Sequence, residues 1–381
     1  MISPLQDFFL FLVKLNLMLK KILFISLLSL LLFSCQKTET VRQQPVNKTA
    51  IADSAVLTFQ QKLYTTQIDS VFSRYNFNGS IGIFKDNTEL YRRNNGFSNF
   101  ENKTEINDST VFSIASISKQ FTAVLILLQM EQGKLNLNDK ASKYCKELQK
   151  KEYENITIQQ LLNHSSGLNN FGEKLLFKSG SGFNYSNDGF NALGKIIETV
   201  SEKSFDENML ELLKKTGMKN SSTGTTFKGE NFAQTYVGNS KIQKKVENMP
   251  KRLANKEIGI PAGGVLSTIN DLHIWNNALY SGKIIKPETL KKFMAKSTER
   301  QHPILGTMGY GLGIMMNDNK PVSYFHSGYV KGAPSLNIYY PETKTSVIIL
   351  SNIADEEKGK SAAFRPHLKI KETADILENI N

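Results

Sequence analysis

The sequence predicts a mixed α+β fold, in which an antiparallel sheet flanked by terminal helices carries an inserted helical lobe at about 115–300. Three observations support this prediction. Short segments with strand character lie near both ends of the chain, a long middle section has helical spacing of its apolar residues, and amphipathic stretches lie close to both termini. Short turns between the strands favour antiparallel pairing, which leaves one face of the sheet to be covered by the terminal helices.

The individual elements follow from periodicity and from residues that end them. Strand patterns occur at 80–84, 89–93, 311–316, 322–325, 336–340 and 346–350, with turn residues such as those at 85–88 and 341–344 between neighbours. Helical patterns occur at 56–72, 117–132, 158–162, 191–200, 205–213, 269–280 and 368–380. We therefore expect two N-terminal and four C-terminal strands around a helical middle.

The N-terminus has the pattern of a secretory signal. Lys20 and Lys21 precede an apolar run at 22–33, which is shorter than the roughly 20 residues that a membrane-spanning helix needs. The residues that close this run, Leu32 to Cys35, resemble the bacterial lipobox, in which the cysteine is lipidated and becomes the new N-terminus. An uncleaved membrane anchor is the alternative, and both interpretations place the rest of the chain outside the cytoplasm.

These observations divide the chain into three parts. We expect a lipoprotein-type signal peptide at 1–34, a polar tether at 35–55 and one large domain at 56–381. The protein would then be held in the cell envelope by a lipid on Cys35 and would face the periplasm or the exterior.

The charge and the cysteine content exclude several classes of protein. The formal net charge is +12, but the basic residues are spread in pairs and form no run interleaved with aromatic residues, so we expect no nucleic-acid partner. The sequence has two cysteines, and lipidation of Cys35 would leave Cys145 without a partner for a disulfide. The five histidines show no zinc-ligand spacing, so we expect neither a metal nor another cofactor.

The first motif with catalytic character is a serine followed three residues later by a lysine. Ser116 and Lys119 open a long apolar helix, and their spacing puts both side chains on one face of it. An adjacent amine can assist a serine hydroxyl as a base or through its charge, and a serine at a helix start offers its backbone N–H to an oxyanion. Ser34 and Lys37 have the same spacing but lie in the signal region, so context favours Ser116. The alternative is that Ser116 and Lys119 are simply solvent-exposed polar residues at the start of a helix.

The second motif is a tyrosine and an asparagine on a glycine-bounded polar loop. Tyr185 can place its phenol beside a nucleophile and act as a general base if neighbouring cations lower its pKa. Asn187 can donate a hydrogen bond to a substrate carbonyl. Tyr153 and Asn155 repeat the spacing but directly precede a helix and have no flanking glycines, which argues against them. The alternative is that Tyr185 is a structural tyrosine that packs in its loop and has no catalytic role.

The third motif follows a predicted strand near the end of the chain. His326 can carry a proton or contact a substrate carboxylate, and Gly328 lets backbone approach a ligand closely. A purely structural histidine is the alternative.

In this order, the three motifs resemble those of class C β-lactamases and D,D-peptidases, the serine β-lactamase and penicillin-binding family. The likeness runs from about Phe77 to Asn352 and includes the segments at 156–168, 261–268 and 310–313. It implies a β-lactamase/transpeptidase-like fold and a Ser116 nucleophile, with Lys119 and Tyr185 sharing the proton transfers. It also implies substrate contacts from Asn187, His326 and Gly328, and an oxyanion hole formed by the backbone N–H groups of Ser116 and Tyr329.

Two departures from the family pattern bear on the substrate. The third motif begins with His326 rather than lysine, so a permanent cation for a β-lactam carboxylate is missing at that position, and the segment between Leu168 and Tyr185 is short. We therefore expect a hydrolase of a small peptide, a D-amino-acid peptide or an ester. A class C-like β-lactamase and a non-hydrolytic binding or sensing lipoprotein are the alternatives.

The lipobox predicts that Cys35→Ala releases the protein from membranes or stops its processing. Membrane fractionation and the intact mass of the mature protein test this expectation. Unchanged fractionation together with an unchanged membrane-bound mass would contradict it.

Overall fold

The computed structural model describes residues 48–75, 77–239, 241–255 and 258–380. The chain divides into two units, Met1–Ala52 and Asp53–Asn381, and the architecture below is that of the second. The predicted signal segment, Cys35 and most of the predicted tether lie outside the described residues.

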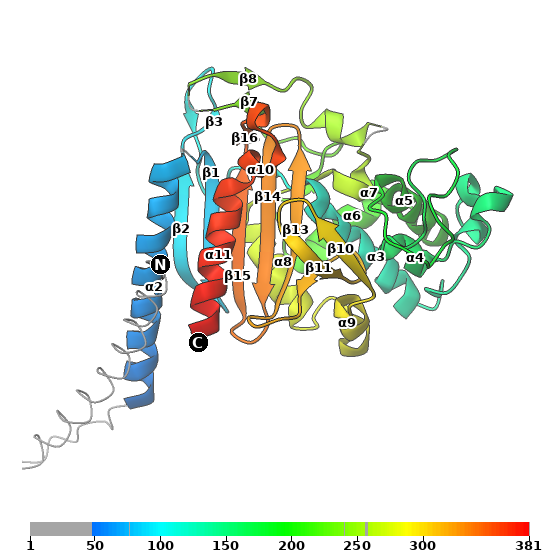
Figure 1. Cartoon of the computed structure of the whole chain (residues 1–381), viewed down its shortest axis with the longest axis horizontal. Coiled ribbons are helices and arrows are strands. Elements are labelled where there is room, and N and C mark those ends of the chain that lie inside the picture. The colour runs from blue at the N-terminus through cyan, green and yellow to red at the C-terminus, as the bar shows by residue number, and fades with distance from the viewer. Residues whose placement is uncertain (1–47, 76, 240, 256–257, 381) are drawn as a thin grey trace, which may run out of the picture. The chain divides into compact units, whose positions relative to one another are not determined.

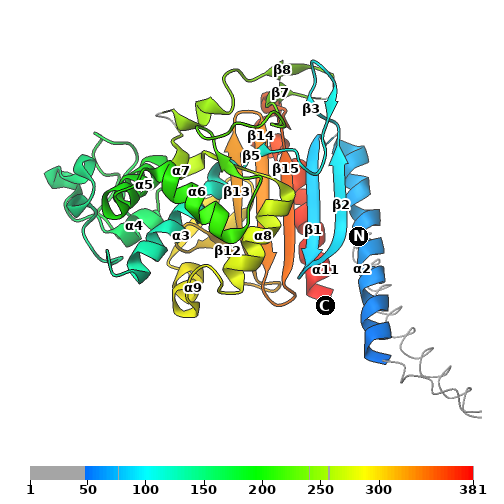
Figure 2. The ribbon, with the colours of Figure 1, turned by 180° about the vertical axis from the view of Figure 1, so that it is seen from behind.

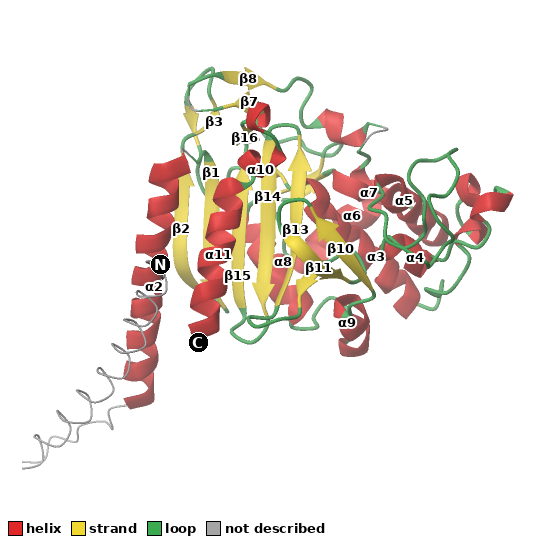
Figure 3. Cartoon of the chain, viewed as in Figure 1, coloured by secondary structure: helices red, strands yellow, loops and turns green. Residues whose placement is uncertain are grey.

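A large antiparallel sheet runs through the fold, with the strand order β10-β11-β12-β13-β14-β15-β1-β2. Figure 3 shows this sheet with helices on both of its faces. Its strands are β1 (Gly79–Lys85), β2 (Thr88–Asn95), β10 (Thr298–His302), β11 (Gly306–Tyr310), β12 (Met315–Asn317), β13 (Ser323–Val330), β14 (Ala333–Tyr340) and β15 (Thr345–Ser351). The pairing of β1 with β15, from Gly79 opposite Ser351 to Lys85 opposite Thr345, joins the two ends of the chain in one sheet.

Alternating residues of the central strands serve two different cores. In β15, Val347 and Ile349 pack with the terminal helices α2 (Lys48–Tyr75) and α11 (Arg365–Ile380). Ile348 and Leu350 point to the opposite face and join the core that holds α8 (Ile269–Tyr280). Figure 1 shows α11 in front of the sheet, and Figure 2 shows α8 on the other side. This two-sided burial follows from the two-residue period of a strand.

The segment between β2 and β10 forms the lobe. Its helices are α3 (Ser118–Glu131), α4 (Ile158–Leu162), α5 (Asn187–Ser201), α6 (Phe205–Thr216), α7 (Ile260–Gly263), α8 and α9 (Pro287–Met294). Short strands also belong to it: β3 (Phe97–Asn99) with β4 (Thr104–Glu105), β5 (Phe112–Ser113) with β9 (Val265–Ser267) and β6 (Ser222–Thr223), and β7 (Tyr236–Gly238) with β8 (Gln243–Lys245). The chain closes with β16 (Ile353–Ala354) and α10 (Lys360–Ala363) before α11.

The predicted elements match these bounds well in most places. The α+β class with a large antiparallel sheet and flanking helices is confirmed. Helix α8 has the predicted limits, and α2 begins at Lys48, within the segment that the sequence assigned to the tether, because alanines precede the first periodic apolar residues.

Two strand predictions were wrong. The strand predicted at 311–316 is a turn as far as Ile314, where the N–H of Gly311 donates to the carbonyl of Ile314 at 2.8 Å. The expected count of four C-terminal strands was also too low, because β10 and β11 had no recognisable pattern. Thr298–His302 is almost entirely polar, and Gly306–Tyr310 contains two glycines, so neither segment shows apolar alternation.

A short 3₁₀ turn, η1 (Ala115–Ile117), connects β5 to α3 and packs against β13 and β14. Ala115 has a φ of 47°, an uncommon conformation for a residue with a side chain. The hydroxyl of Ser118 donates to the Ala115 carbonyl at 2.6 Å and accepts from the Val265 N–H at 3.0 Å, which holds this turn in place. The turn that contains Ser116 is therefore fixed by contacts from β9 and from the main sheet.

Gly328 in β13 makes this packing possible. A Cβ at this position would lie 2.2 Å from the Ile114 carbonyl oxygen and 2.3 Å from the Ser335 hydroxyl, which itself donates to Ile114 at 2.9 Å. Only a residue without a side chain lets η1 lie directly on β13.

We therefore expect Gly328→Ala to lower the free energy of unfolding by about 1–3 kcal/mol, because backbone must move to admit the methyl group. Gly189→Ala is the matched control, since its nearest neighbour would be an ordinary 3.6 Å away and α5 gains a better helix former. Denaturant unfolding of both variants tests this. Equal stability of Gly328→Ala and the unaltered protein would contradict the expectation.

Candidate active site

Ser116 lies in η1, directly before α3, and is half-buried. One turn further on, Lys119 is completely buried in the helical lobe. Its Nζ lies 3.2 Å from the Ser116 Oγ, so the predicted pairing of these two side chains on one helix face is present. Ser116 lies at the junction of the lobe and the sheet, because η1 packs against β13 and β14 and leads directly into α3.

The Lys119 amine has two further oxygen contacts. Its Nζ lies 2.9 Å from the Asn187 Oδ1 and 2.7 Å from the Ala262 carbonyl oxygen. A carbonyl oxygen can only accept, so two of the amine's positions must be N–H donors. The contact with Ser116 is the one that can run in either direction, as N–H donor to the hydroxyl or as lone-pair acceptor from it. The geometry therefore suits a proton that passes between Ser116 and Lys119.

Tyr185 lies beside this pair, in the loop before α5. The Lys119 Nζ lies 4.7 Å from the centroid of its ring, and the Arg300 guanidinium lies 4.2 Å from the same centroid. His164 packs against the ring at 4.4 Å between centroids, and its Nδ1 accepts from the Ser186 N–H at 3.2 Å. His164 thus positions the loop that carries Tyr185 and Asn187, as a structural residue.

Burial and neighbouring charges shift the pKa values of both groups. Burial lowers the pKa of Lys119 below its ordinary value, because it penalises the ammonium. Burial alone would raise the pKa of Tyr185, but the charges of Lys119 and Arg300 and hydrogen bonds with Ser116 and Lys119 outweigh it and lower that pKa. Both shifts are downward, so the amine and the phenol each lose a proton more readily than the free side chains do.

His326 lies in the interior of the fold. Its side chain is fully buried, its Nδ1 lies 2.7 Å from the Ser327 carbonyl oxygen and its Nε2 lies 3.1 Å from the Tyr310 hydroxyl. Burial first, and then the charges of Lys119 and Arg300, hold its pKa well below 6.5. The structure therefore does not support the expectation that His326 contacts a substrate carboxylate as a cation. The lowered pKa favours the uncharged imidazole at neutral pH, and the ring links β13 to β11 through Tyr310.

Gly328 and Tyr329 belong to the part of β13 that lies beyond its pairing with β12. Tyr329 is opposite Pro334 of β14, and β12 pairs only with residues 323–325 of β13, so the other side of β13 at Tyr329 has no strand neighbour. The η1 turn lies against this part of β13 because of Gly328. The Tyr329 side chain is directed elsewhere and donates its hydroxyl to Glu356.

Sequence reasoning missed three contributors to this site. Arg300 and His302 come from β10, whose polar sequence gave no strand signal. The Ala262 carbonyl is a backbone group, 143 residues from Lys119 in the chain, and the segment around it was recognised only as a likeness to the family. The pairing of β10 with β11, which contains two glycines, could be found only from the structure.

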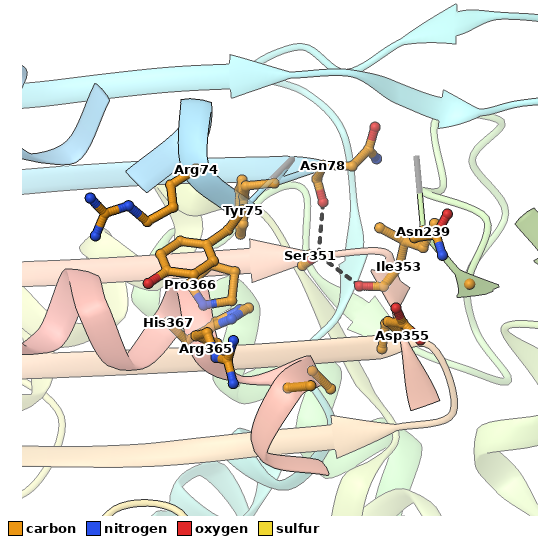
Figure 4. Close-up of a pocket in the computed structure, with 15 residues that line it drawn as sticks. Arg74, Tyr75, Asn78, Asn239, Ser351, Ile353, Asp355, Arg365, Pro366 and His367 are labelled. Carbon is orange, nitrogen blue, oxygen red and sulfur yellow. Dashed lines mark hydrogen bonds between the residues drawn. The ribbon is translucent and has the colours of Figure 1, made fainter. Parts of the chain in front are cut away.

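The structure also contains a polar cavity that shares none of these residues. Figure 4 shows its lining, which includes Arg74, Arg365 and His367, and its volume is about 560 Å³. Its one lining serine, Ser351, donates its hydroxyl to the Asn78 carbonyl at 2.8 Å and to the Ile353 carbonyl at 3.2 Å. Because the Ser351 hydroxyl is hydrogen-bonded to backbone carbonyls, it is not an activated nucleophile. We therefore look for the catalytic chemistry at Ser116.

Among the described residues, no group of three or more histidine, cysteine or acidic side chains is arranged to hold a metal ion. Within the same stretches of chain, no helix combines the length and the apolar character needed to cross a membrane.

Comparison with known proteins connects this geometry to a family. The Protein flp of Staphylococcus aureus strain MW2 is 26% identical over 309 residues, which are 73% of this chain and 60% of that protein, so the chain spans about 60% of the length of this relative. The penicillin-binding protein 4* of Bacillus subtilis strain 168 is 23% identical over 345 residues, or 80% of this chain and 75% of that protein.

A solved structure agrees with these relatives. The octameric penicillin-binding protein homologue from Pyrococcus abyssi superposes with a TM-score of 0.68 and 25% identity, covering 81% of this chain and 77% of that one. The family described as Beta-lactamase matches residues 68–370, which is most of the chain and contains Ser116, Lys119 and Tyr185. The chain therefore belongs to the Beta-lactamase family, the serine β-lactamase and penicillin-binding-protein group.

Proposed function

We propose that this protein is a serine hydrolase that forms an acyl-enzyme on Ser116. Membership of the family supports a hydrolase broadly. The observation that carries the finer proposal is the contact of 3.2 Å between the Ser116 Oγ and the Lys119 Nζ. The Asn187 Oδ1 and the Ala262 carbonyl oxygen beside the amine can only accept, and the Tyr185 phenol is a further hydrogen-bond partner. A protein that only binds a ligand has no need for a fully buried amine beside a half-buried hydroxyl.

The reaction proceeds by transfer of an acyl group to Ser116 and then to water. The Ser116 Oγ bonds to the carbonyl carbon of the substrate while its proton leaves to Lys119 or Tyr185. The bond to the leaving group then breaks, and the same proton is given to that group. Water attacks the acyl-enzyme and gives up a proton to the pair, which returns one to the Ser116 Oγ as the acid is released.

The oxyanion formed in both steps needs two fixed donors. We assign these to the backbone N–H groups of Ser116 in η1 and of Tyr329, which lies in the part of β13 that does not pair with β12. Gly328 contributes by letting these two segments lie in contact. The amide Nδ2 of Asn187, whose Oδ1 is turned to Lys119, is left to donate to the substrate carbonyl.

The proposed substrate is a small peptide, a D-amino-acid peptide or an ester. One relative bears the name penicillin-binding protein, which makes acylation by penicillin a reasonable alternative reaction for this chain. A neutral His326 does not supply the cation that an efficient β-lactamase of the resembled group would have at that position. For this reason we favour the peptidase or esterase reaction over antibiotic hydrolysis.

We also propose that the reaction takes place outside the cytoplasm, in a protein tethered to a membrane by a lipid on Cys35. The support for this is the lipobox-like pattern and the polar residues that follow it.

The proposal predicts that Ser116→Ala abolishes both labelling by a fluorophosphonate and hydrolysis of esters, because the nucleophile is removed. Ser109→Ala is the control, since Ser109 is an exposed serine whose hydroxyl contacts Asn107. Labelling is measured by the mass of the adduct on the soluble form that starts after Cys35. Ester hydrolysis by Ser116→Ala at the original rate would place the nucleophile elsewhere.

A fluorescent penicillin distinguishes the alternative functions of the same site. Labelling by the fluorophosphonate but not by penicillin is the result expected for an esterase or a peptidase of other substrates. Stable labelling by penicillin would indicate a D,D-peptidase, rapid turnover of penicillin would indicate a β-lactamase, and labelling by neither reagent would indicate a binding protein.

The shared proton transfer predicts that Lys119→Ala and Tyr185→Phe each lower kcat/KM by about a hundredfold or more. Tyr153→Phe is the matched control, because Tyr153 belongs to the other Tyr-x-Asn sequence and its hydroxyl contacts the backbone of Gly172 and Glu173, away from Ser116. Steady-state kinetics with one ester substrate measures all three. A similar loss in Tyr153→Phe and Tyr185→Phe would show that the effect is structural and not catalytic.

A further inference from the structure

The polar cavity of Figure 4 lies where the two terminal helices meet the sheet, and it shares no lining residue with the site at Ser116. Its walls come from the end of α2, the start of β1, the turn after β7, the segment from β15 to β16 and the start of α11. Its volume of about 560 Å³ falls within the range of cavities that hold small organic ligands. The cavity is therefore much larger than an inorganic ion needs.

Two arginines line this cavity, and neither has a carboxylate partner within the part of the chain that the structure describes. Arg74 lies in the last turn of α2 and Arg365 begins α11, and both side chains are exposed. The nearby Lys369 donates to Glu372 at 2.6 Å, which raises the pKa of Lys369 against the opposing charge of Arg74. Glu372 is thus already paired, and the two guanidinium groups keep their N–H donors for another group.

The lining carries one net positive charge. Besides the two arginines it includes one carboxylate, Asp355, and one imidazole, His367. Burial lowers the pKa of His367 to about 3, so its ring is uncharged at neutral pH. Two positive charges and one negative charge leave a net +1, which suits a ligand with a single negative charge. Figure 4 shows Asp355 on the other side of the cavity from Arg74 and Arg365, so the anionic end of such a ligand belongs at the arginines.

The remaining walls define the body of the ligand. Most of the side chains that complete them are apolar, namely Phe77, Ile353, Ala354, Ala362, Ala363 and Pro366. The Nε2 of His367 donates to the Pro334 carbonyl at 3.1 Å, so its Nδ1 keeps a lone pair, and this buried atom has no hydrogen-bond partner among the described residues. A ligand group that reaches this Nδ1 must therefore be a donor, and apolar walls favour an apolar body.

We infer that this cavity is a second binding site, which takes a small organic carboxylate with an apolar body. The carboxylate binds the guanidinium groups of Arg74 and Arg365, and the body of the ligand covers the apolar walls around Phe77. The site binds without catalysing a reaction, because the hydroxyl of Ser351 donates to backbone carbonyls. Its ligand is not the substrate acylated at Ser116, so the inference does not depend on the proposed function.

Three small molecules test this inference by isothermal titration of the full-length protein in a non-ionic detergent. 3-Phenylpropionate has both the carboxylate and the apolar body, 3-phenylpropanamide lacks the charge, and acetate lacks the body. We expect 3-phenylpropionate to bind at least about tenfold more tightly than the other two. Arg74→Ala and Arg365→Ala should each weaken its binding by about tenfold, the scale of one lost charged hydrogen bond. Ala362→Trp should abolish binding by filling the cavity while both charges stay.

Two control variants show where the carboxylate binds. Arg252→Ala is the matched control, because it removes an exposed arginine of η5 (Lys251–Ala254), outside the cavity. Arg300→Ala removes the cation beside Tyr185, and both controls should bind 3-phenylpropionate as the unaltered protein does. The arginine variants decide the result if Ala362→Trp does not fold, which denaturant unfolding shows.

Three results would overturn the inference. One is the absence of binding by the unaltered protein, and another is equal affinity for 3-phenylpropionate and its amide. The third is a loss of binding in Arg300→Ala but not in Arg365→Ala, which would place the carboxylate beside Ser116 and leave the cavity without a ligand.

Discussion

The buried amine of Lys119 is the constraint on which the rest of the site depends. Removing an ammonium from water costs several kcal/mol unless hydrogen bonds replace its hydration. Here the replacement comes from three different elements: the Ser116 hydroxyl in η1, the Asn187 side chain at the start of α5 and the Ala262 carbonyl in α7. Each element must therefore keep its place for Lys119 to remain buried, and their packing explains much of the lobe.

The close packing around these elements follows from small residues. A Cβ at Gly313 would lie 2.9 Å from the Lys119 carbonyl oxygen, and a Cβ at Gly194 would lie 2.3 Å from the Pro261 Cγ. Both distances are too short for a side chain to fit without a shift of the neighbouring atoms. Together with Gly328 beneath η1, these glycines let α3, α5, α7 and β13 approach the nucleophile from different directions. Apart from the loop that holds Tyr185, the site is thus built on helices, the η1 turn and strands, which suits a reaction that requires fixed donors.

Much of this could be predicted from the sequence, and the limits have physical causes. The spacing of Ser116 and Lys119 fixes their common face on any helix, and the apolar pattern gave α8 its correct limits. Arg300 could not be found, because β10 is an edge strand with polar residues on both faces and so lacks the alternation that marks a buried strand. The surroundings of His326 could not be predicted for a related reason: its sequence context suggests a strand end, but only the fold shows complete burial and the partner hydroxyl of Tyr310.

The central claim is that Lys119 lowers the pKa of Tyr185 so that the two share the Ser116 proton. Carbon-13 NMR of protein labelled at the tyrosine Cζ measures this, with Tyr185→Phe identifying the resonance of Tyr185. We expect Tyr185 to titrate below the ordinary tyrosine pKa of about 10, and its pKa to rise in Lys119→Met, because burial would then be opposed by Arg300 alone of the two neighbouring cations. A Tyr185 resonance that titrates at or above pH 10 in the unaltered protein, and that does not move in Lys119→Met, would contradict the account.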